Sequence, residues 1–183
     1  MSSVVVLLAA GKSSRTTTMK QLYKVDGEYL INLQIKKILS YSYNVAVVLG
    51  HNYENIVSIL EKDVKVVYNA NYKEGMFSSV KEAFRELSEE VLLFCHIDRP
   101  IADRDVFESL LKCESEVAVA YLYQRRAPPI MIKSTKKDAL LSSQHSRLDH
   151  WVVSNTDLSL VEVTDEKVHF NANTDEELRR YFA

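Results

Sequence analysis

A short polar segment near the start of the chain carries the densest set of groups that could do chemistry. Residues 11–15 (Gly-Lys-Ser-Ser-Arg) follow an apolar run at residues 4–10, and Lys20 comes soon after. With Lys20 included, the segment offers backbone N–H groups, two hydroxyls and three cations. Clustered amides and fixed cations replace the water that phosphates lose on binding. The pattern therefore predicts a site for the polyphosphate of a nucleotide.

Two common phosphate-binding motifs do not fit this segment. Gly-Lys-Ser also occurs in the Walker loop, but that loop needs an earlier Gly at the position where this chain has Val6. The dinucleotide-binding fingerprint fails as well, because no second Gly lies near Gly11. The apolar run, rich in β-branched residues, instead predicts a buried strand that delivers the loop to one end of a sheet.

The loop resembles the signature of a known family. Residues 8–20 read Leu-Ala-Ala-Gly-x-Ser-x-Arg-x4-Lys, similar to the motif of nucleotidyltransferases that activate sugars, isoprenoid precursors and the molybdenum cofactor. The resemblance implies that Arg15 holds the leaving phosphates and Lys20 the phosphates around the reacting centre. It implies further nucleotide contacts from Leu8, Ala9, Ala10, Gly11 and Ser13. Residues 16–17 (Thr-Thr) replace the family's Met-Gly, and β-branched side chains stiffen a loop.

A carboxylate follows the fourth predicted strand. Asp98 comes after the apolar residues 91–94 and stands two positions before Pro100. At a strand end beside a polyphosphate, a carboxylate suits Mg²⁺, which prefers oxygen ligands. The family carries a metal-binding Asp in this place after a small residue, which Ile97 replaces here. The resemblance implies that Asp98 is a catalytic metal ligand, and a plain turn-forming Asp is the alternative.

The loops after the second and third predicted strands extend the proposed nucleotide site. Residues 69–80 look like a segment of the molybdenum cofactor cytidylyltransferases, which suggests nucleotide contacts from Gly75, Ser78 and Ser79. A helix start presents free N–H groups to an anion or a base edge. Gly50 is expected to let the backbone approach the ligand closely. The alternative is a plain capped helix with ordinary turn glycines.

The C-terminal residues carry the last matching motif. Residues 171–178 (Asn-Ala-Asn-Thr-Asp-Glu-Glu-Leu) resemble the closing motif of the same family. Asn173 stands where relatives place a second metal ligand, and its oxygen adds no charge. Asp175 replaces the usual Pro. Thr174 and Glu177 have the spacing of a capping box, so a helix is expected to start there.

Composition narrows the class of protein. A chain of 183 residues can bury a full core, so residues 1–183 are expected to form one domain. A net charge of −2 gives no general attraction to nucleic acid, so any affinity for phosphate must be local. Cys95 and Cys113 are too few for a disulfide framework, which indicates a reducing, cytoplasmic setting. No segment has the length or the flanks expected of a membrane span or a signal peptide.

Hydrophobic patterning predicts the elements that must position these residues. The expected strands are residues 4–10, 45–49, 64–68, 91–97 and 117–121, and the expected helices are residues 29–41, 54–62, 78–87 and 105–113. This alternation predicts an α/β fold, a three-layer Rossmann-like and mostly parallel sheet flanked by helices. Shorter strands at residues 130–132 and 158–163 predict a small antiparallel addition in the C-terminal third. In such sheets, ligands bind at the carboxyl ends of the strands.

The resemblance implies Mg²⁺-dependent transfer of a nucleoside monophosphate from a triphosphate to a phosphorylated acceptor, with release of pyrophosphate. The acceptor phosphate is already anionic at neutral pH, with a second pKa of about 6, so no general base is required. Ala10 and the segment at Gly75 favour CTP and a molybdopterin-type acceptor. Residues 125–151 are expected to cover that acceptor, with Arg126 and Arg147 among the candidates to bind its phosphate.

The sequence also allows other functions. The departures at residues 16–17 and Ile97, with an uncharged Asn171 and Asn173, leave room for a nucleotide-binding or accessory protein of this fold with weakened catalysis. A second alternative is transfer to a sugar phosphate or another small phosphate. A partner enzyme that hands over the acceptor is a further expectation, whereas nucleic acid and membranes are not expected as partners.

Overall fold

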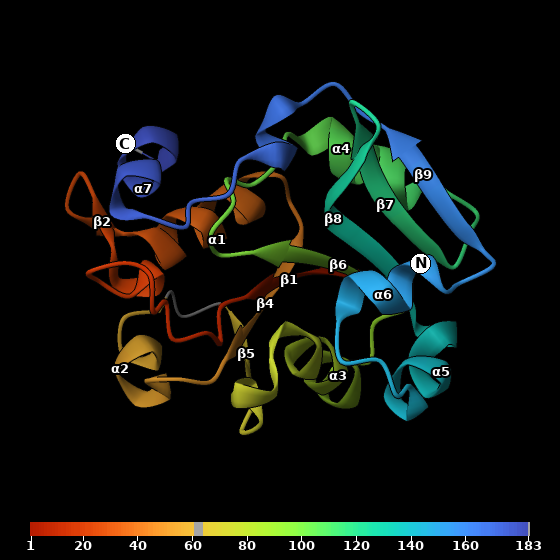
Figure 1. Ribbon diagram of the computed structural model, residues 1–183, viewed down its shortest axis with the longest axis horizontal. Helices are drawn as coiled ribbons and strands as arrows, with labels where there is room; N and C mark the ends of the chain where they lie inside the picture. Colours follow the sequence, from red (N-terminus) through yellow and green to blue (C-terminus); the bar gives the residue numbers. More distant parts are fainter. Residues whose placement is uncertain (61–63, 183) are drawn as a thin grey trace.

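The computed structural model describes residues 1–60 and 64–182. The expected alternation of strands and helices is confirmed, and seven strands among these residues form one sheet in the order β5-β4-β1-β6-β8-β7-β9 (Figure 1). The strands are β1 (Ser3–Leu8), β4 (Asn44–Leu49), β5 (Lys65–Tyr68), β6 (Val91–His96), β7 (Val117–Leu122), β8 (Arg125–Lys133) and β9 (Leu158–Glu162). A separate antiparallel pair consists of β2 (Lys24–Val25) and β3 (Glu28–Tyr29).

The main sheet is mostly parallel, as the sequence predicts. β1 pairs in parallel with β4 and β6, and β4 pairs in parallel with β5. The expected antiparallel element is β8, which is longer than residues 130–132 and pairs with both β6 and β7. The second expected addition, at residues 158–163, differs from the prediction because β9 pairs in parallel with β7. Thus β8 lies within the sheet, between β6 and β7.

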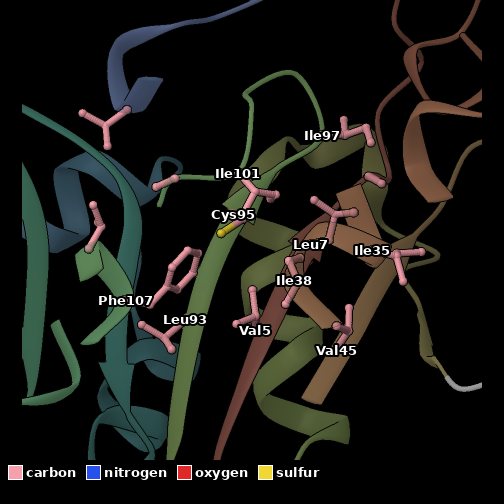
Figure 2. Packing of buried hydrophobic residues seen from close by; sticks show 14 of the residues in the cluster. Val5, Leu7, Ile35, Ile38, Val45, Leu93, Cys95, Ile97, Ile101 and Phe107 are labelled. Carbon is pink, nitrogen blue, oxygen red and sulfur yellow. The ribbon is translucent and has the colours of Figure 1, made fainter. Parts of the chain in front are cut away.

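Helices cover both faces of the sheet because side chains alternate along each strand. Val5 and Leu7 of β1 belong to one buried cluster, whereas Val4 and Val6 belong to the other. The first face is covered by α1 (Leu30–Ser40), α2 (Tyr53–Val57), α4 (Arg104–Leu111) and α7 (Asp175–Phe182). The second face is covered by α3 (Met76–Glu86), α5 (Lys137–Ser142) and α6 (Leu148–Val153). Figure 2 shows the first cluster, with Ile35 of α1 and Phe107 of α4 packed on the strands.

Short 3-10 helices fill several loops: η1 (Lys20–Leu22), η2 (Tyr72–Glu74), η3 (Ser134–Lys136) and η4 (Glu166–His169). Gly75 precedes α3 with a φ of 100°, a backbone conformation that favours glycine, so the predicted helix opening at Gly75 is confirmed. The second predicted helix is shorter than expected, since α2 ends at Val57. Residues 61 and 62 of that prediction lie outside the described residues.

The loops that follow β1, β5 and β6 meet at the carboxyl edge of the sheet, since these strands run in one direction. The C-terminal segment returns to this edge, where the backbone N–H of Ala172 donates to the carbonyl oxygen of Asp98 at 2.8 Å. Residues from both ends of the chain therefore share one site. No helix within the described residues is long and apolar enough to cross a membrane.

Candidate functional site

The loop between residues 11 and 19 is held from beneath by a buried side chain. Gln21 has no exposed surface, and its amide nitrogen donates to the carbonyl oxygens of Ala9 and Gly11 at 2.6 and 3.0 Å. The Ser13 hydroxyl donates to Gln21 Oε1 at 3.3 Å and accepts from the backbone N–H of Lys20 at 3.1 Å. Sequence reasoning missed Gln21, although a Gln next to a predicted phosphate-binding Lys20 was a usable signal. The Ser13 hydroxyl therefore shapes the loop from within.

Asp98 and Lys20 form an ion pair at the centre of the site. Lys20 Nζ lies 3.0 Å from Asp98 Oδ2, and the two side chains are 8% and 24% exposed. Asp98 sits in the turn after β6, where the backbone N–H of Arg99 bonds to the carbonyl of His96 at 3.1 Å. The neighbouring Ile97 is 7% exposed and packs into the core on the α1 side, while part of it also lines the site.

Two adjoining hollows meet at Asp98. The smaller, of about 260 Å³, lies over the 11–19 loop, and the larger, of about 620 Å³, extends toward β8 and α6. Both are lined by Arg15, Gly75, His96 and Asp98. The predicted nucleotide residues that line the smaller hollow are Leu8, Ala10, Gly11, Ser13, Arg15, Lys20, Gly75 and Ser79. This arrangement suits two ligands that meet at one carboxylate.

Three predicted nucleotide residues lie away from the two hollows. Ala9 packs in the core beneath the loop. The Ser78 hydroxyl donates to the carbonyls of Asn71 and Gly75 at 3.0 and 2.7 Å, so it braces the turn before α3. Gly50 lies against Tyr72, which leaves no room for a side chain, and lines a separate hollow. The positions of Ser78 and Gly50 favour the alternative that the sequence left open, a capped helix start for Ser78 and an ordinary turn glycine for Gly50.

The C-terminal segment contributes two carboxamide side chains to the hollow that Asp98 lines. Asn171 and Asn173 both line the larger hollow with Asp98. Asn171 Oδ1 is buried and has no hydrogen-bond partner among residues 1–60 and 64–182. A buried acceptor without a donor is costly, and a cation would satisfy it. Mg²⁺ takes carboxylate and carboxamide oxygens, so Asp98, Asn171 and Asn173 fit a divalent cation. The sequence pointed to Asn173 as a metal ligand, whereas Asn171 was noted there as an uncharged departure and not as a ligand.

Arg99 supports this segment from below. Its guanidinium donates to the carbonyls of Val168 and Phe170 at 3.0 and 3.3 Å. Burial lowers the pKa of Arg99, and the negative charge of Asp98 acts in the opposite direction. Arg99 therefore fixes the chain leading to Asn171.

Side chains of the 11–19 loop also reach the C-terminal segment. The Arg15 guanidinium donates to Asn173 Oδ1 at 2.6 Å. The backbone N–H of Thr17 donates to the Asp175 carboxylate at 3.1 Å, and its hydroxyl donates at 2.5 Å. Hydrogen bonds from the Thr17 hydroxyl and then its N–H hold the pKa of Asp175 below its ordinary value. Residues that are far apart in sequence thus close the loop over the site.

The predicted capping box at the start of α7 is confirmed. The backbone N–H of Glu177 donates to the Thr174 hydroxyl at 3.2 Å, and the N–H of Thr174 donates to Glu177 Oε2 at 3.1 Å. Glu177 Oε2 also accepts from the N–H of Asn173 at 2.7 Å. The cap of α7 therefore fixes the backbone of Asn173 beside Asp98.

The larger hollow has an apolar wall and a basic rim. Phe77, Ile130, Leu148 and Val152 line the wall, and Arg126 and Arg147 contribute to the rim. Arg147 already has a partner, because its guanidinium donates two hydrogen bonds to the Asp149 carboxylate, at 2.9 and 2.8 Å. Trp151 lies behind the wall, 4% exposed, with its ring centroid 6.2 Å from that of Phe77. Trp151 is therefore a packing residue.

His96 lies between the two hollows and was not singled out from the sequence. Its Nε2 is buried without a hydrogen-bond partner within the described part of the chain. Burial lowers the pKa of His96 to about 4, although the nearby Asp98 acts in the opposite direction. The imidazole is therefore neutral at pH 7 and adds no positive charge beside Asp98.

The fold and site define an α/β domain that gathers a phosphate-suited loop, cations and oxygen ligands at the carboxyl edge of parallel strands. Residues 5–158 match the family of MobA-like NTP transferase domains. Because the match covers most of the chain, the protein belongs to this family. The match ends before Asn173. That Asn171 and Asn173 belong to the site is therefore known from the structure and not from the family match.

Individual relatives are distant. The chain is 23% identical over 122 residues to the molybdenum cofactor cytidylyltransferase of Escherichia coli K12, a match that spans 64% of this chain and 62% of that protein. A nucleotidyl transferase from Methanothermobacter thermautotroptrophicus has a TM-score of 0.82 at 18% identity, over 98% of this chain and 95% of that chain. Rv0371c of Mycobacterium tuberculosis in complex with manganese has a TM-score of 0.76 at 16% identity, over 99% of this chain and 98% of that chain. At these identities the structural likeness shows the shared fold.

Proposed function

We propose that this chain is a single nucleotidyltransferase domain that moves a nucleoside monophosphate from a triphosphate to a phosphorylated acceptor and releases pyrophosphate. The observation that carries the proposal is the Asp98–Lys20 pair, 3.0 Å apart, at the junction of the two hollows. The smaller hollow would hold the triphosphate and the larger one the acceptor. The reacting phosphates would then meet at Asp98.

The reaction needs little covalent chemistry from the protein. An acceptor phosphate oxygen attacks the α-phosphorus, the bond from that phosphorus to the β-phosphate bridging oxygen breaks, and pyrophosphate leaves with the electron pair. The acceptor oxygen carries no proton at neutral pH. Arg15 would bind the leaving phosphates and Lys20 the phosphates around the reacting centre. Catalysis would come from positioning and from neutralising charge.

Asp98, Asn171 and Asn173 would hold a divalent cation, for which we propose Mg²⁺. When bound, such a cation neutralises the negative charge that develops on the phosphates. The protein supplies one carboxylate here, so the triphosphate must supply the remaining negative ligands. The manganese complex of Rv0371c supports a divalent cation in this fold.

The donor and acceptor are proposed from the family relationship and the larger hollow. CTP is favoured by Ala10 and by the match to the cytidylyltransferase of Escherichia coli K12. A hollow of about 620 Å³ with an apolar wall and Arg126 at its rim suits a phosphorylated acceptor with a bulky, flat body, such as molybdopterin. A partner enzyme would deliver or receive that acceptor. Cys95 and Cys113 are free thiols, which supports a cytoplasmic setting.

A nucleotide-binding protein without turnover is the second candidate. Lys20 and Arg15 already hold Asp98 and Asn173, the oxygens proposed for the cation. If these bonds persist when nucleotide binds, the cation has no site and transfer fails. Transfer to a sugar phosphate or another small phosphate is the third candidate.

A thermal-unfolding series with CTP, GTP, ATP and UTP, each with and without Mg²⁺, tests the proposal. A ligand at about 100 times its dissociation constant adds about 2.7 kcal/mol. In a domain of this size the melting temperature should rise by roughly 5–10 °C. We expect the largest shift with CTP and Mg²⁺, followed by pyrophosphate release once the acceptor is added. A shift without pyrophosphate release from any acceptor favours the binding protein, and no shift with any nucleotide contradicts the proposal.

A further inference from the structure

The outer half of the 11–19 loop depends on the C-terminal segment. The inner half is fixed by the bonds of Ser13 and Gln21 beneath it. From residues 14–18, the hydrogen bonds that leave the loop go to Asn173 and Asp175 within the part of the chain that the structure describes. The order of the outer half therefore rests on these contacts.

The two contacts have the same spacing along the loop and along the C-terminal segment. Arg15 donates to Asn173, and Thr17, two positions further, donates to Asp175, also two positions further. Residues 14–18 form turns and bends, and Asp175 lies at the start of α7, so the loop folds against the beginning of the helix and both contacts form there. Asp175 accepts from both the N–H and the hydroxyl of Thr17, which fixes backbone and side chain at once.

We infer that Asp175 is a positioning residue, which holds Thr17 and thereby keeps Arg15 of the 11–19 loop over the nucleotide site. The assignment of Arg15 to the triphosphate rests on the proposed function, but the contact between loop and helix does not. Asp175 lies in the first turn of α7, where an acid is also favoured by the helix dipole. The experiment must therefore separate a stabilised helix start from an ordered loop.

The contact between Thr17 and Asp175 can open and close readily. Thr17 is exposed, and water competes for exposed hydrogen bonds. Asp175 orders the loop before nucleotide arrives, so less free energy is spent on ordering it at binding. Loss of the contact should raise the KM for nucleotide, while kcat stays near its original value because the bound nucleotide itself holds the loop.

Trypsin provides a direct measure of loop order, because it cleaves after Arg15 only when the loop opens. We expect Asp175→Ala to raise the initial rate of cleavage between residues 15 and 16 by about three- to tenfold in the absence of nucleotide. Glu176→Ala is the matched control, since it removes the same charge from the same turn of α7. It should leave the cleavage rate unchanged. Asp175→Asn keeps an oxygen acceptor for Thr17 and should retain most of the protection.

The loop side of the contact is tested separately. Thr17→Val removes the hydroxyl donor and should raise cleavage, whereas Thr18→Val, one position away, should not. In the double variant Thr17→Val/Asp175→Ala, cleavage should rise no further than in Asp175→Ala, because both changes break one contact. If Asp175→Ala fails to fold, Thr17→Val alone still decides the question.

Three outcomes would overturn the inference: cleavage of Asp175→Ala at the original rate, an equal rise in Glu176→Ala, or additive effects in the double variant. The cleavage assay uses no nucleotide, so it is independent of the proposed function. If the unmodified protein neither binds nucleotide nor releases pyrophosphate, the proposed function fails while the cleavage result stands. If turnover is present, an unchanged KM in Asp175→Ala contradicts the positioning role by itself.

Discussion

Two cations already lie on the oxygens proposed for the metal. Lys20 Nζ contacts Asp98 at 3.0 Å, and Arg15 contacts Asn173 at 2.6 Å. Because we also assign both cations to the triphosphate, binding requires an exchange in which they move onto phosphate and release the oxygens. A divalent cation by itself has to displace them, whereas a cation bound to nucleotide brings the replacement ligands with it. Metal and nucleotide are therefore expected to bind together.

Asp98 is the residue on which this exchange depends. We expect Asp98→Asn to lower pyrophosphate release by at least about 100-fold, because the substitution removes the only proposed carboxylate ligand. The melting temperature without ligand should also fall, because the substitution removes the counter-charge of the buried Lys20, so turnover is compared at a temperature where both proteins are folded. Turnover is followed by pyrophosphate release, and the thermal shift with CTP and Mg²⁺ should shrink in parallel.

Asp103→Asn is the control for that substitution. Asp103 precedes α4 in the same stretch of chain after β6, but it pairs with Lys167 Nζ at 2.5 Å and lines neither hollow at Asp98. Turnover should remain near that of the unmodified protein. Full activity in Asp98→Asn, or an equal loss in both variants, would refute the assignment of Asp98.

At the scale of elements, two glycines that look alike in sequence have different surroundings. Gly11 follows β1, and a Cβ added there would meet no atom within 4 Å. Gly50 follows β4, and a Cβ added there would lie 2.6 Å from Cβ of Tyr72. Tyr72 lines the smaller hollow, so Gly50 acts on the site through the packing of η2.

Alanine substitutions separate these two roles. We expect Gly50→Ala to cost about 1–3 kcal/mol, because Tyr72 and its turn must shift to make room. This corresponds to a fall in melting temperature of roughly 2–10 °C. Gly11→Ala should melt as the unmodified protein does, yet its Cβ would enter the hollow and reduce the thermal shift with nucleotide. Equal melting temperatures for the two variants would contradict this account of Gly50.

At the scale of the molecule, the site unites the two ends of the chain. Arg15 contacts Asn173, and α7 is anchored in the core by Leu178, which has no exposed surface. Strand β8 joins the parallel strands on one side to β7 and β9 on the other. The wall of the larger hollow, on α3, β8 and α6, belongs to the same buried cluster as β1. Unfolding of the sheet and of the site should therefore be one event.

Trp151, the only tryptophan of the chain, tests this expectation. It lies in α6 behind the wall of the larger hollow, far in sequence from the 11–19 loop. Its fluorescence and the far-ultraviolet circular dichroism should report the same denaturation midpoint. CTP with Mg²⁺ should raise both midpoints equally. An earlier transition in fluorescence would show that α6 and its neighbours unfold as a separate unit.

Local patterns in the sequence predicted the class of fold and the edge of the sheet where the candidate site lies. Strand and helix periodicity predicted the alternating elements, and the rule that ligands bind at carboxyl strand ends placed Gly11, Lys20 and Asp98 at one edge. These inferences succeeded because they depend on local pattern and on the direction of parallel strands. The capping box at Thr174 was predictable for the same reason.

Which polar groups are free to bind a ligand depends on contacts between distant segments, and these are visible only in the folded chain. Local sequence does not show that Tyr72 fills the space beside Gly50. It does not show that Asn171 Oδ1 is buried and lacks a donor within the part of the chain that the structure describes. It does not show that Asp175 meets Thr17, because that contact joins segments from opposite ends of the chain. Hydrogen bonding and close packing depend on the final distances between such segments, and those distances are set only when the whole sheet and its helices assemble.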